Sequence, residues 1–205
     1  MYTLIGNPKN RSFRALWALE ELGLAYEINA ADPRSEAMLA VNPTGKSPAM
    51  VDAEYPDQAI TDSAAIVQYL ADKHRELSYS AGTIERAQQD AMLHFVNDEF
   101  DSVLWMNAKH KFAYPKEYRR DGVIDGVMYE LARSMAVLED RLAQQSYLMG
   151  ERFTVPDIVL GHCIGWLKSS KLDWPETGPL NDYARRLTSR EAYLRAAEIR
   201  KGYLV

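Results

Sequence analysis

Two prolines and a glycine interrupt the chain in residues 42–52, Asn-Pro-Thr-Gly-Lys-Ser-Pro-Ala-Met-Val-Asp. Pro48 has no N–H to donate and favours an extended backbone at Ser47, so a short strand is predicted to open at Pro48. The backbone N–H and C=O of Ser47 then have no evident partner in that strand. Such a pair can bind a peptide by strand-like hydrogen bonds, and the alternative is a plain tight loop between a helix and a strand. The Ser47–Pro48 bond is also a candidate cis bond.

A second chemical feature lies at Asp62 and Ser63, which directly precede a helical pattern with Ile66, Val67 and Leu70 on its apolar face. Short polar side chains in this place predict a helix N-cap. A helix N-terminus with a hydroxyl and free N–H groups can also bind an anion. The two roles are compatible.

Residues 42–48 resemble the Asn-Pro-x-Gly-x-Val-Pro signature of the cytosolic glutathione transferases, with Ser47 in place of the usual Val. Residues 62–70, Asp-Ser-Ala-Ala-Ile-Val-Gln-Tyr-Leu, resemble a second motif of that family. The resemblance implies that glutathione is the co-substrate, that Pro48 is cis, and that the Ser47 backbone holds the cysteinyl part of glutathione.

The same resemblance implies roles for three polar side chains. Ser63 would bind the carboxylate of the γ-glutamyl group and Asp62 its ammonium, although Asp is one methylene shorter than the commoner Glu. Lys46 is a candidate partner for the glycyl carboxylate. The structural alternative for Lys46 is a solvated lysine.

Glutathione reacts as a thiolate, and the pKa of a free cysteine thiol is about 8.5. Lowering that pKa to about 6.5 requires about 2.7 kcal/mol. A helix N-terminus supplies up to about 2 kcal/mol and a hydrogen bond to a charged group about 1.5–3 kcal/mol. We therefore expect a donor side chain at the start of the first helix.

Asn10 is the first candidate for this donor, because residues 6–10, Gly-Asn-Pro-Lys-Asn, resemble the Gly-x-Pro-x-Ser loop of serine-type family members. That resemblance places Asn10 where the catalytic serine would be. Ser12 is the second candidate and lies two positions later. The structural alternatives are a simple N-cap for Asn10 and a solvated first-turn residue for Ser12.

The elements that must position these residues follow the order βαβαββα, which is that of a thioredoxin-like α/β domain. Strands are predicted at 2–5, 25–30, from Pro48 onward and at 58–61, and helices at 11–22, 35–40 and from 63 onward. Gly23 is predicted to close the first helix. The first strand, helix and second strand should form a right-handed parallel unit.

Regular patterning stops at residues 74–83, and everything after it has helical patterns. The predicted organisation is a glutathione-binding domain at 1–75, a linker at 76–84 and an all-helical domain at 85–205. Helices are predicted at 84–112, 123–145, 156–167 and 180–200. Thr154 and Asp157 form a predicted capping box, with Asp in place of Glu.

Trp105, Lys109 and Phe112 share one face of a predicted helix at spacings i, i+4 and i+7. If that helix flanks the thiol, the three side chains would line a pocket for an electrophilic second substrate. The alternative is plain core or a subunit interface.

Composition excludes several classes. The formal charge is −5, the reverse of the basic face that nucleic acid requires. The single cysteine, Cys163, cannot form an internal disulfide, and the chain shows neither a basic and apolar leader nor a span of membrane length. We therefore expect a cytoplasmic protein that binds no membrane. We also expect no metal, since the four histidines lack metal-ligand spacing.

The predicted function is that of a glutathione transferase, in which the glutathione thiolate attacks an electrophilic small molecule. The resemblance also implies a homodimer. Two alternatives stay open: a glutathione-dependent disulfide or peroxide reductase, and a non-catalytic protein of the same fold that binds or regulates.

Overall fold

The computed structural model describes residues 1–204. These residues divide into two compact units, one formed by residues 1–83 and 188–204 and the other by Ile84–Leu187. Among the described residues, no helix is both long enough and apolar enough to cross a membrane. The predicted domain limits at 1–75, 76–84 and 85–205 stay a prediction. The division into units shows that residues 188–204 pack with residues 1–83.

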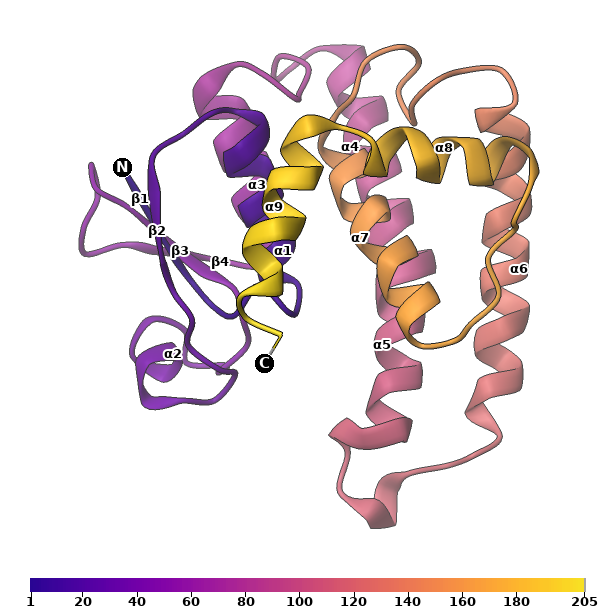
Figure 1. The fold of residues 1–205 in the computed structure, drawn as a ribbon, viewed down its shortest axis with the longest axis horizontal. Helices are drawn as coiled ribbons and strands as arrows, with labels where there is room; N and C mark the ends of the chain where they lie inside the picture. The colour runs from indigo at the N-terminus through magenta and orange to yellow at the C-terminus, as the bar shows by residue number, and fades with distance from the viewer. Residues whose placement is uncertain (205) are drawn as a thin grey trace. The chain divides into compact units, whose positions relative to one another are not determined.

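The first unit is built on a mixed sheet with strand order β2-β1-β3-β4 (Figure 1). β1 pairs in parallel with β2, whereas β1 with β3 and β3 with β4 are antiparallel. The order of elements confirms the predicted thioredoxin-like βαβαββα domain. Its elements are β1 Tyr2–Ile5, α1 Ser12–Glu21, β2 Tyr26–Asn29, α2 Glu36–Val41, β3 Ala49–Asp52, β4 Ala59–Thr61 and α3 Ser63–His74.

Helices α1 and α3 pack together along one side of the sheet (Figure 1). The apolar side chains of α1 are buried, with Leu16 and Trp17 fully inaccessible to solvent. Gly23 ends the helix as predicted: its φ is +61°, and the Leu24 N–H returns to the Leu19 carbonyl at 3.0 Å. Met38 of α2 packs instead in a separate small cluster with Ile5 and Ala49.

The predicted helix at 180–200 is two helices, α8 Gly178–Thr188 and α9 Glu191–Lys201. The prediction of one continuous helix was wrong because the backbone of Arg190 is extended, with ψ 134°. This break lets α9 pack against α1, where the Tyr193 ring meets the Trp17 ring edge-on at 4.9 Å. Arg190 Nε also binds Glu21 Oε1 at 2.6 Å.

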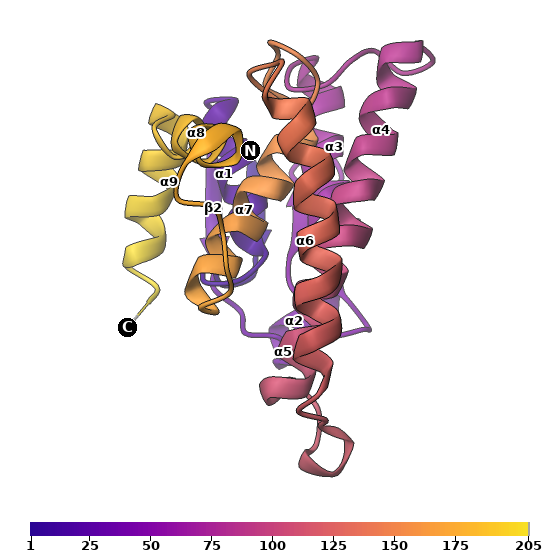
Figure 2. The ribbon, with the colours of Figure 1, turned by 90° about the vertical axis from the view of Figure 1, so that its right-hand side faces the viewer.

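The second unit is helical, as predicted, and Figure 2 shows its longer helices running alongside one another. The predicted helix at 84–112 is interrupted twice by π-helical turns, which periodicity alone did not indicate. Such turns insert a residue into the i→i−4 ladder and are common near functional sites. The elements of the second unit are α4 Ile84–Val96, the π-helix η1 Asn97–Ser102, α5 Val103–Ala108, the π-helix η2 Lys109–Ala113, the 3₁₀-helix η3 Lys116–Tyr118, α6 Val123–Leu142, α7 Val155–Ser169 and α8.

The capping box predicted at the start of α7 is confirmed. Asp157 is fully buried, and its carboxylate accepts hydrogen bonds from the Thr154 N–H at 2.8 Å and the Leu148 N–H at 2.9 Å. The Thr154 hydroxyl and the Tyr183 hydroxyl also donate to it, at 3.1 and 2.8 Å. One carboxylate therefore joins α7, α8 and the loop before α7.

Candidate functional site

The N-terminus of α3 presents a carboxylate and a hydroxyl side by side. Asp62 is the N-cap, as predicted, and its Oδ1 accepts from the Ala64 and Ala65 N–H groups at 2.9 and 3.1 Å. Its backbone has φ +73°, a conformation that few residues other than Gly adopt. The second carboxylate oxygen of Asp62 has no partner within residues 1–204, and the side chain is exposed. That oxygen can receive an ammonium group.

Ser63 is buried against an arginine that the sequence reasoning missed. Arg14 of α1 is 1% exposed, and its Nη1 donates to Ser63 Oγ at 3.1 Å. Because a guanidinium can only donate, Ser63 Oγ is the acceptor, and its own hydrogen remains available for an anion. A buried positive charge behind a hydroxyl at a helix N-terminus suits a carboxylate. The only signal in the sequence was a charged residue between apolar neighbours, Phe13 on one side and residues 15–19 on the other.

The Ser47–Pro48 peptide bond is cis. Pro48 is buried directly before β3, and the loop leading to it is held by Asn42, whose Nδ2 donates to the Lys46 carbonyl at 2.7 Å. Within the described chain, no hydrogen bond engages the Ser47 N–H or C=O. The main chain of Ser47 is therefore available for a peptide, whereas Lys46 beside it is exposed.

Asn10 lies at the start of α1 with its amide oxygen turned toward the protein. Its Oδ1 accepts from the Ser12 N–H at 2.9 Å, from the Ser12 hydroxyl at 2.9 Å and from the Ser47 hydroxyl at 3.2 Å. Because a backbone N–H can only donate, the atom that it contacts must be the amide oxygen. The NH₂ group of Asn10 consequently has no partner among residues 1–204 and is free to donate.

Both catalytic candidates therefore lie in one cluster with Ser47, and they differ in accessibility. Ser12 is fully buried, and its hydroxyl lies 2.9 Å from both Asn10 Oδ1 and Ser47 Oγ. Asn10 is partly exposed. The arrangement presents an amide donor, rather than a serine hydroxyl, at the surface of the helix start.

Trp105, Lys109 and Phe112 all belong to the second unit and lie on α5 and η2. Trp105 and Lys109 are half-buried, whereas Phe112 is 65% exposed. The change from α-helix to π-helix at Lys109 alters the angular spacing on which the shared face was predicted. Lys109 Nζ lies 5.9 Å from the centre of the Tyr114 ring. Their role in an electrophile pocket stays a prediction.

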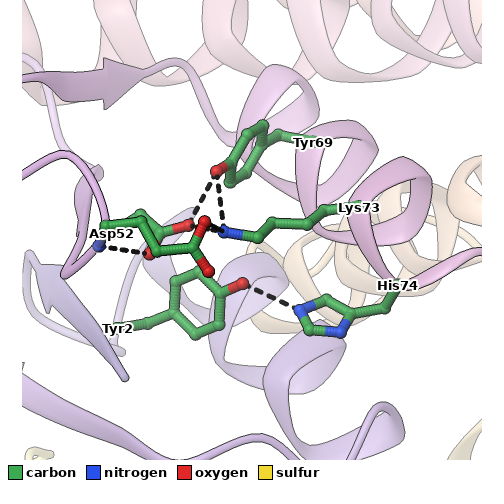
Figure 3. Close-up of polar contacts among 6 residues, drawn as sticks. Tyr2, Asp52, Tyr69, Lys73 and His74 are labelled. Atoms are coloured by element: carbon green, nitrogen blue, oxygen red, sulfur yellow. Dashed lines mark hydrogen bonds and ion pairs between the residues drawn. The ribbon is translucent and has the colours of Figure 1, made fainter.

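A polar cluster, which sequence reasoning did not identify, ties β3 to α3 (Figure 3). Asp52, at the end of β3, accepts from Lys73 Nζ at 2.5 Å and from the Tyr69 hydroxyl at 2.7 Å. Beside it, the Tyr2 hydroxyl lies 2.8 Å from His74 Nε2. The cluster fixes the relative placement of β3 and α3, whose starts carry Ser47–Pro48 and Asp62–Ser63.

This cluster gives a testable pH dependence. Burial by itself raises the pKa of Asp52, but hydrogen bonds from Lys73 and Tyr69 outweigh it and lower the pKa from 3.8 to about 2. A depressed folded-state pKa stabilises the fold above about pH 4, and this stabilisation is lost as the pH falls from about 4 to about 2. We expect Asp52→Asn to remove about 2 kcal/mol of pH-dependent stability in that window, measured by urea unfolding.

The matched control is Asp57→Asn, which changes an exposed carboxylate in the loop before β4. Because Asp57 lies outside the cluster, this variant shows whether removing a carboxylate elsewhere produces the same change as Asp52→Asn. If Asp52→Asn lost as much stability as the unaltered chain between pH 4 and pH 2, the cluster would not have the role assigned to it.

No group of three or more His, Cys, Asp or Glu side chains within residues 1–204 is arranged to hold a metal ion. Cys163 on α7 is buried. The chemistry that the described residues offer is hydrogen bonding to a peptide, an anion, an ammonium and an ionised thiol.

Comparison with known proteins assigns a class to this fold. A model described as "Glutathione S-transferase, N-terminal domain" matches residues 10–78, and one described as "Glutathione S-transferase, C-terminal domain" matches residues 121–198. Glutathione S-transferase 2 of Schizosaccharomyces pombe is 30% identical over 77% of this chain and 70% of its own length. Elongation factor 1-gamma 1 of Oryza sativa is also 30% identical, over 78% of this chain but only 38% of its own.

Solved structures agree with this class. A glutathione transferase from Methylococcus capsulatus has a TM-score of 0.86 and 27% identity, covering 98% of this chain and 99% of its own. A sphingomonad glutathione S-transferase complexed with glutathione has a TM-score of 0.84 and 26% identity, covering 97% and 98%. The fold is a thioredoxin-like domain followed by a helical domain, as these relatives have it. The chain belongs to the glutathione S-transferase family and is assigned to the transferase class of enzymes.

Proposed function

We propose that the first unit binds glutathione along β3 and the starts of α1 and α3. The main-chain N–H and C=O of Ser47, which have no other partner among residues 1–204, pair with the cysteinyl backbone of glutathione. Lys46 is exposed beside it and meets the glycyl carboxylate.

The γ-glutamyl group binds at the N-terminus of α3. The Ser63 hydroxyl donates to its carboxylate, supported by the buried guanidinium of Arg14 at 3.1 Å. The second carboxylate oxygen of Asp62 receives its ammonium. This pairing uses the carboxylate and the ammonium of the γ-glutamyl group in the charged forms that they have at neutral pH.

The sulfur lies at the start of α1, where the Asn10 amide donates to it. The orientation of this amide is the observation that carries the proposal, because Oδ1 accepts from the Ser12 N–H at 2.9 Å and the NH₂ has no partner among residues 1–204. A donor to a charged sulfur contributes about 1.5–3 kcal/mol, and the helix N-terminus adds up to about 2 kcal/mol. Together these cover the roughly 2.7 kcal/mol that lowers the thiol pKa to about 6.5.

The bound thiolate then attacks an electrophilic carbon, and the chain contributes positioning and stabilisation of the anionic sulfur. Trp105 and Phe112 contact the apolar part of the electrophile, and Lys109 attracts a carboxylate on it. The protein works as a cytoplasmic homodimer.

Turnover tests the reaction class. With glutathione, we expect conjugation of a chloronitroaromatic substrate to exceed reduction of a small disulfide at equal concentrations. Reduction alone would establish the reductase alternative, and retention on immobilised glutathione without turnover of either substrate would establish a binding protein. Resemblance to part of an elongation factor gives that last alternative its support.

The role of Lys109 is tested with two electrophiles that differ in charge. Lys109→Ala should slow conjugation of a carboxylate-bearing electrophile more than that of a neutral one. If Lys109→Ala conjugated both substrates at the same rates as the unaltered chain, Lys109 would not be part of the pocket.

A further inference from the structure

Three side-chain oxygens from distant parts of the chain converge at the start of α1. Ser12 Oγ lies 2.9 Å from Asn10 Oδ1 and 2.9 Å from Ser47 Oγ, and Ser47 Oγ lies 3.2 Å from Asn10 Oδ1. Ser47 thus contributes its side chain to the asparagine, besides the main chain proposed to hold glutathione. This oxygen triangle, formed by Asn10, Ser12 and Ser47, is closed by contacts on all three sides.

Gly6 at the end of β1 makes room for the triangle. A Cβ at Gly6 would lie 2.4 Å from Ser12 Oγ and 2.5 Å from Ser47 Oγ, well inside contact distance. Its φ of +140° is also one that side chains disfavour. The backbone is therefore shaped to let the two hydroxyls approach the asparagine.

Counting hydrogens shows what the triangle does. Asn10 Oδ1 accepts the Ser12 N–H and lies within hydrogen-bond distance of both hydroxyls. One hydroxyl donates to Oδ1 and the other to its neighbour's oxygen, or both share Oδ1. In either case both hydroxyl hydrogens are used within the triangle, and the NH₂ of Asn10, which has no partner among residues 1–204, is left as the donor for a bound sulfur.

We propose that the hydroxyls of Ser12 and Ser47 are positioning residues, which fix the Asn10 amide with its NH₂ toward the glutathione sulfur and strengthen it as a donor. The inference rests on the proposed function of Asn10. Hydrogen bonds to the amide oxygen polarise the amide and make its N–H groups better donors. They also oppose rotation of the amide, which would turn its oxygen toward the anionic sulfur.

The two departures from the family patterns quoted above support this coupling, because they contact each other. By that resemblance, Asn10 stands in the place of a serine and Ser47 in the place of a valine, which has no hydroxyl, and the two side chains contact each other at 3.2 Å. An amide must be oriented in order to present a donor, whereas a serine hydroxyl rotates freely. Ser47 supplies the orientation that an asparagine at position 10 requires.

The test measures the pKa of the bound glutathione thiol by thiolate absorbance in the full chain. Removing both hydroxyls, in Ser12→Ala/Ser47→Ala, should raise that pKa by about 0.5–1 unit, with each single variant giving roughly half of the rise. Ser47→Thr retains the hydroxyl and should keep the pKa of the unaltered chain. Below about pH 6, where the bound thiol is protonated, the dissociation constant for glutathione should change by less than about threefold, because main-chain contacts carry the binding.

A double-mutant cycle with Asn10→Ala separates positioning from direct contact. If the hydroxyls act through the amide, removing them in the Asn10→Ala background should shift the pKa by less than about 0.2 units. If removing the hydroxyls shifted the pKa as much in Asn10→Ala as in the chain with Asn10 intact, the hydroxyls would contact the sulfur themselves, and the proposal would be wrong. It would also be wrong if neither single variant moved the pKa while Asn10→Ala did, an outcome that leaves the proposed function intact. If glutathione bound to the unaltered chain kept the thiol pKa that it has in solution, both the positioning role of the hydroxyls and the proposed function of Asn10 would be wrong.

Discussion

Asn10→Ala is expected to raise the pKa of the bound glutathione thiol by about one to two units and to lower kcat/KM at pH 6.5 by about 10- to 100-fold. The reason is the loss of one hydrogen bond to a charged sulfur, worth about 1.5–3 kcal/mol. The dissociation constant for glutathione above pH 9 should rise too, because the amide contacts only the thiolate form. The measurement is a pH titration of thiolate absorbance, with kcat/KM determined over the same pH range.

Asn10→Asp is the matched variant, since it keeps the size of the side chain but replaces the NH₂ donor by an oxygen. A carboxylate beside the sulfur repels the thiolate, so the loss should exceed that of Asn10→Ala. A thiol pKa that is unchanged in Asn10→Ala would remove Asn10 from the catalytic role. If Ser12→Ala alone then raised the pKa by more than one unit, Ser12 would be the donor.

Asp157→Ala is expected to lower the free energy of unfolding by about 3–5 kcal/mol and to prevent folding at elevated temperature. The carboxylate is fully buried and accepts from two N–H groups and two hydroxyls, at 2.8–3.1 Å. Alanine would leave these donors buried without an acceptor, in addition to a cavity. Burial is the largest influence on Asp157 and raises the pKa of its carboxyl to about 6, so above that pH the group is an acceptor only.

Two milder variants give the scale for this effect. Tyr183→Phe removes one donor of the four and should cost about 1 kcal/mol, whereas Asp157→Asn keeps the shape and should cost an intermediate amount. Chemical unfolding at pH 7.5, followed by circular dichroism, measures all three. An Asp157→Ala variant as stable as Tyr183→Phe would contradict the account of this junction.

Features that depend on near neighbours in the sequence could be predicted. The Asp62 N-cap, the Thr154–Asp157 capping box and the Gly23 stop all join residues a few positions apart, so their signals survive in a linear reading. The thioredoxin-like order of elements followed from periodicity combined with turn residues. The resemblance in residues 42–48 and 62–70 supplied the family.

Features that depend on tertiary packing could not be predicted. Arg14 meets Ser63 across 49 positions, and the Ser47 hydroxyl meets Asn10 across 37, so no local pattern encodes either contact. Helical periodicity also continued through residue 189, although an extended Arg190 ends α8 and lets Tyr193 reach Trp17. Apolar spacing shows which residues are buried, but it does not show which element they pack against.

A crystal structure of the chain with glutathione would show whether Ser47, Ser63 and Asn10 hold the tripeptide. We expect the cysteinyl N–H and C=O to pair with the main chain of Ser47, and the sulfur to lie within hydrogen-bond distance of Asn10 Nδ2. The γ-glutamyl carboxylate should lie on Ser63 and its ammonium on Asp62. Glutathione bound elsewhere on the chain, or a sulfur facing away from Asn10, would contradict the proposed function.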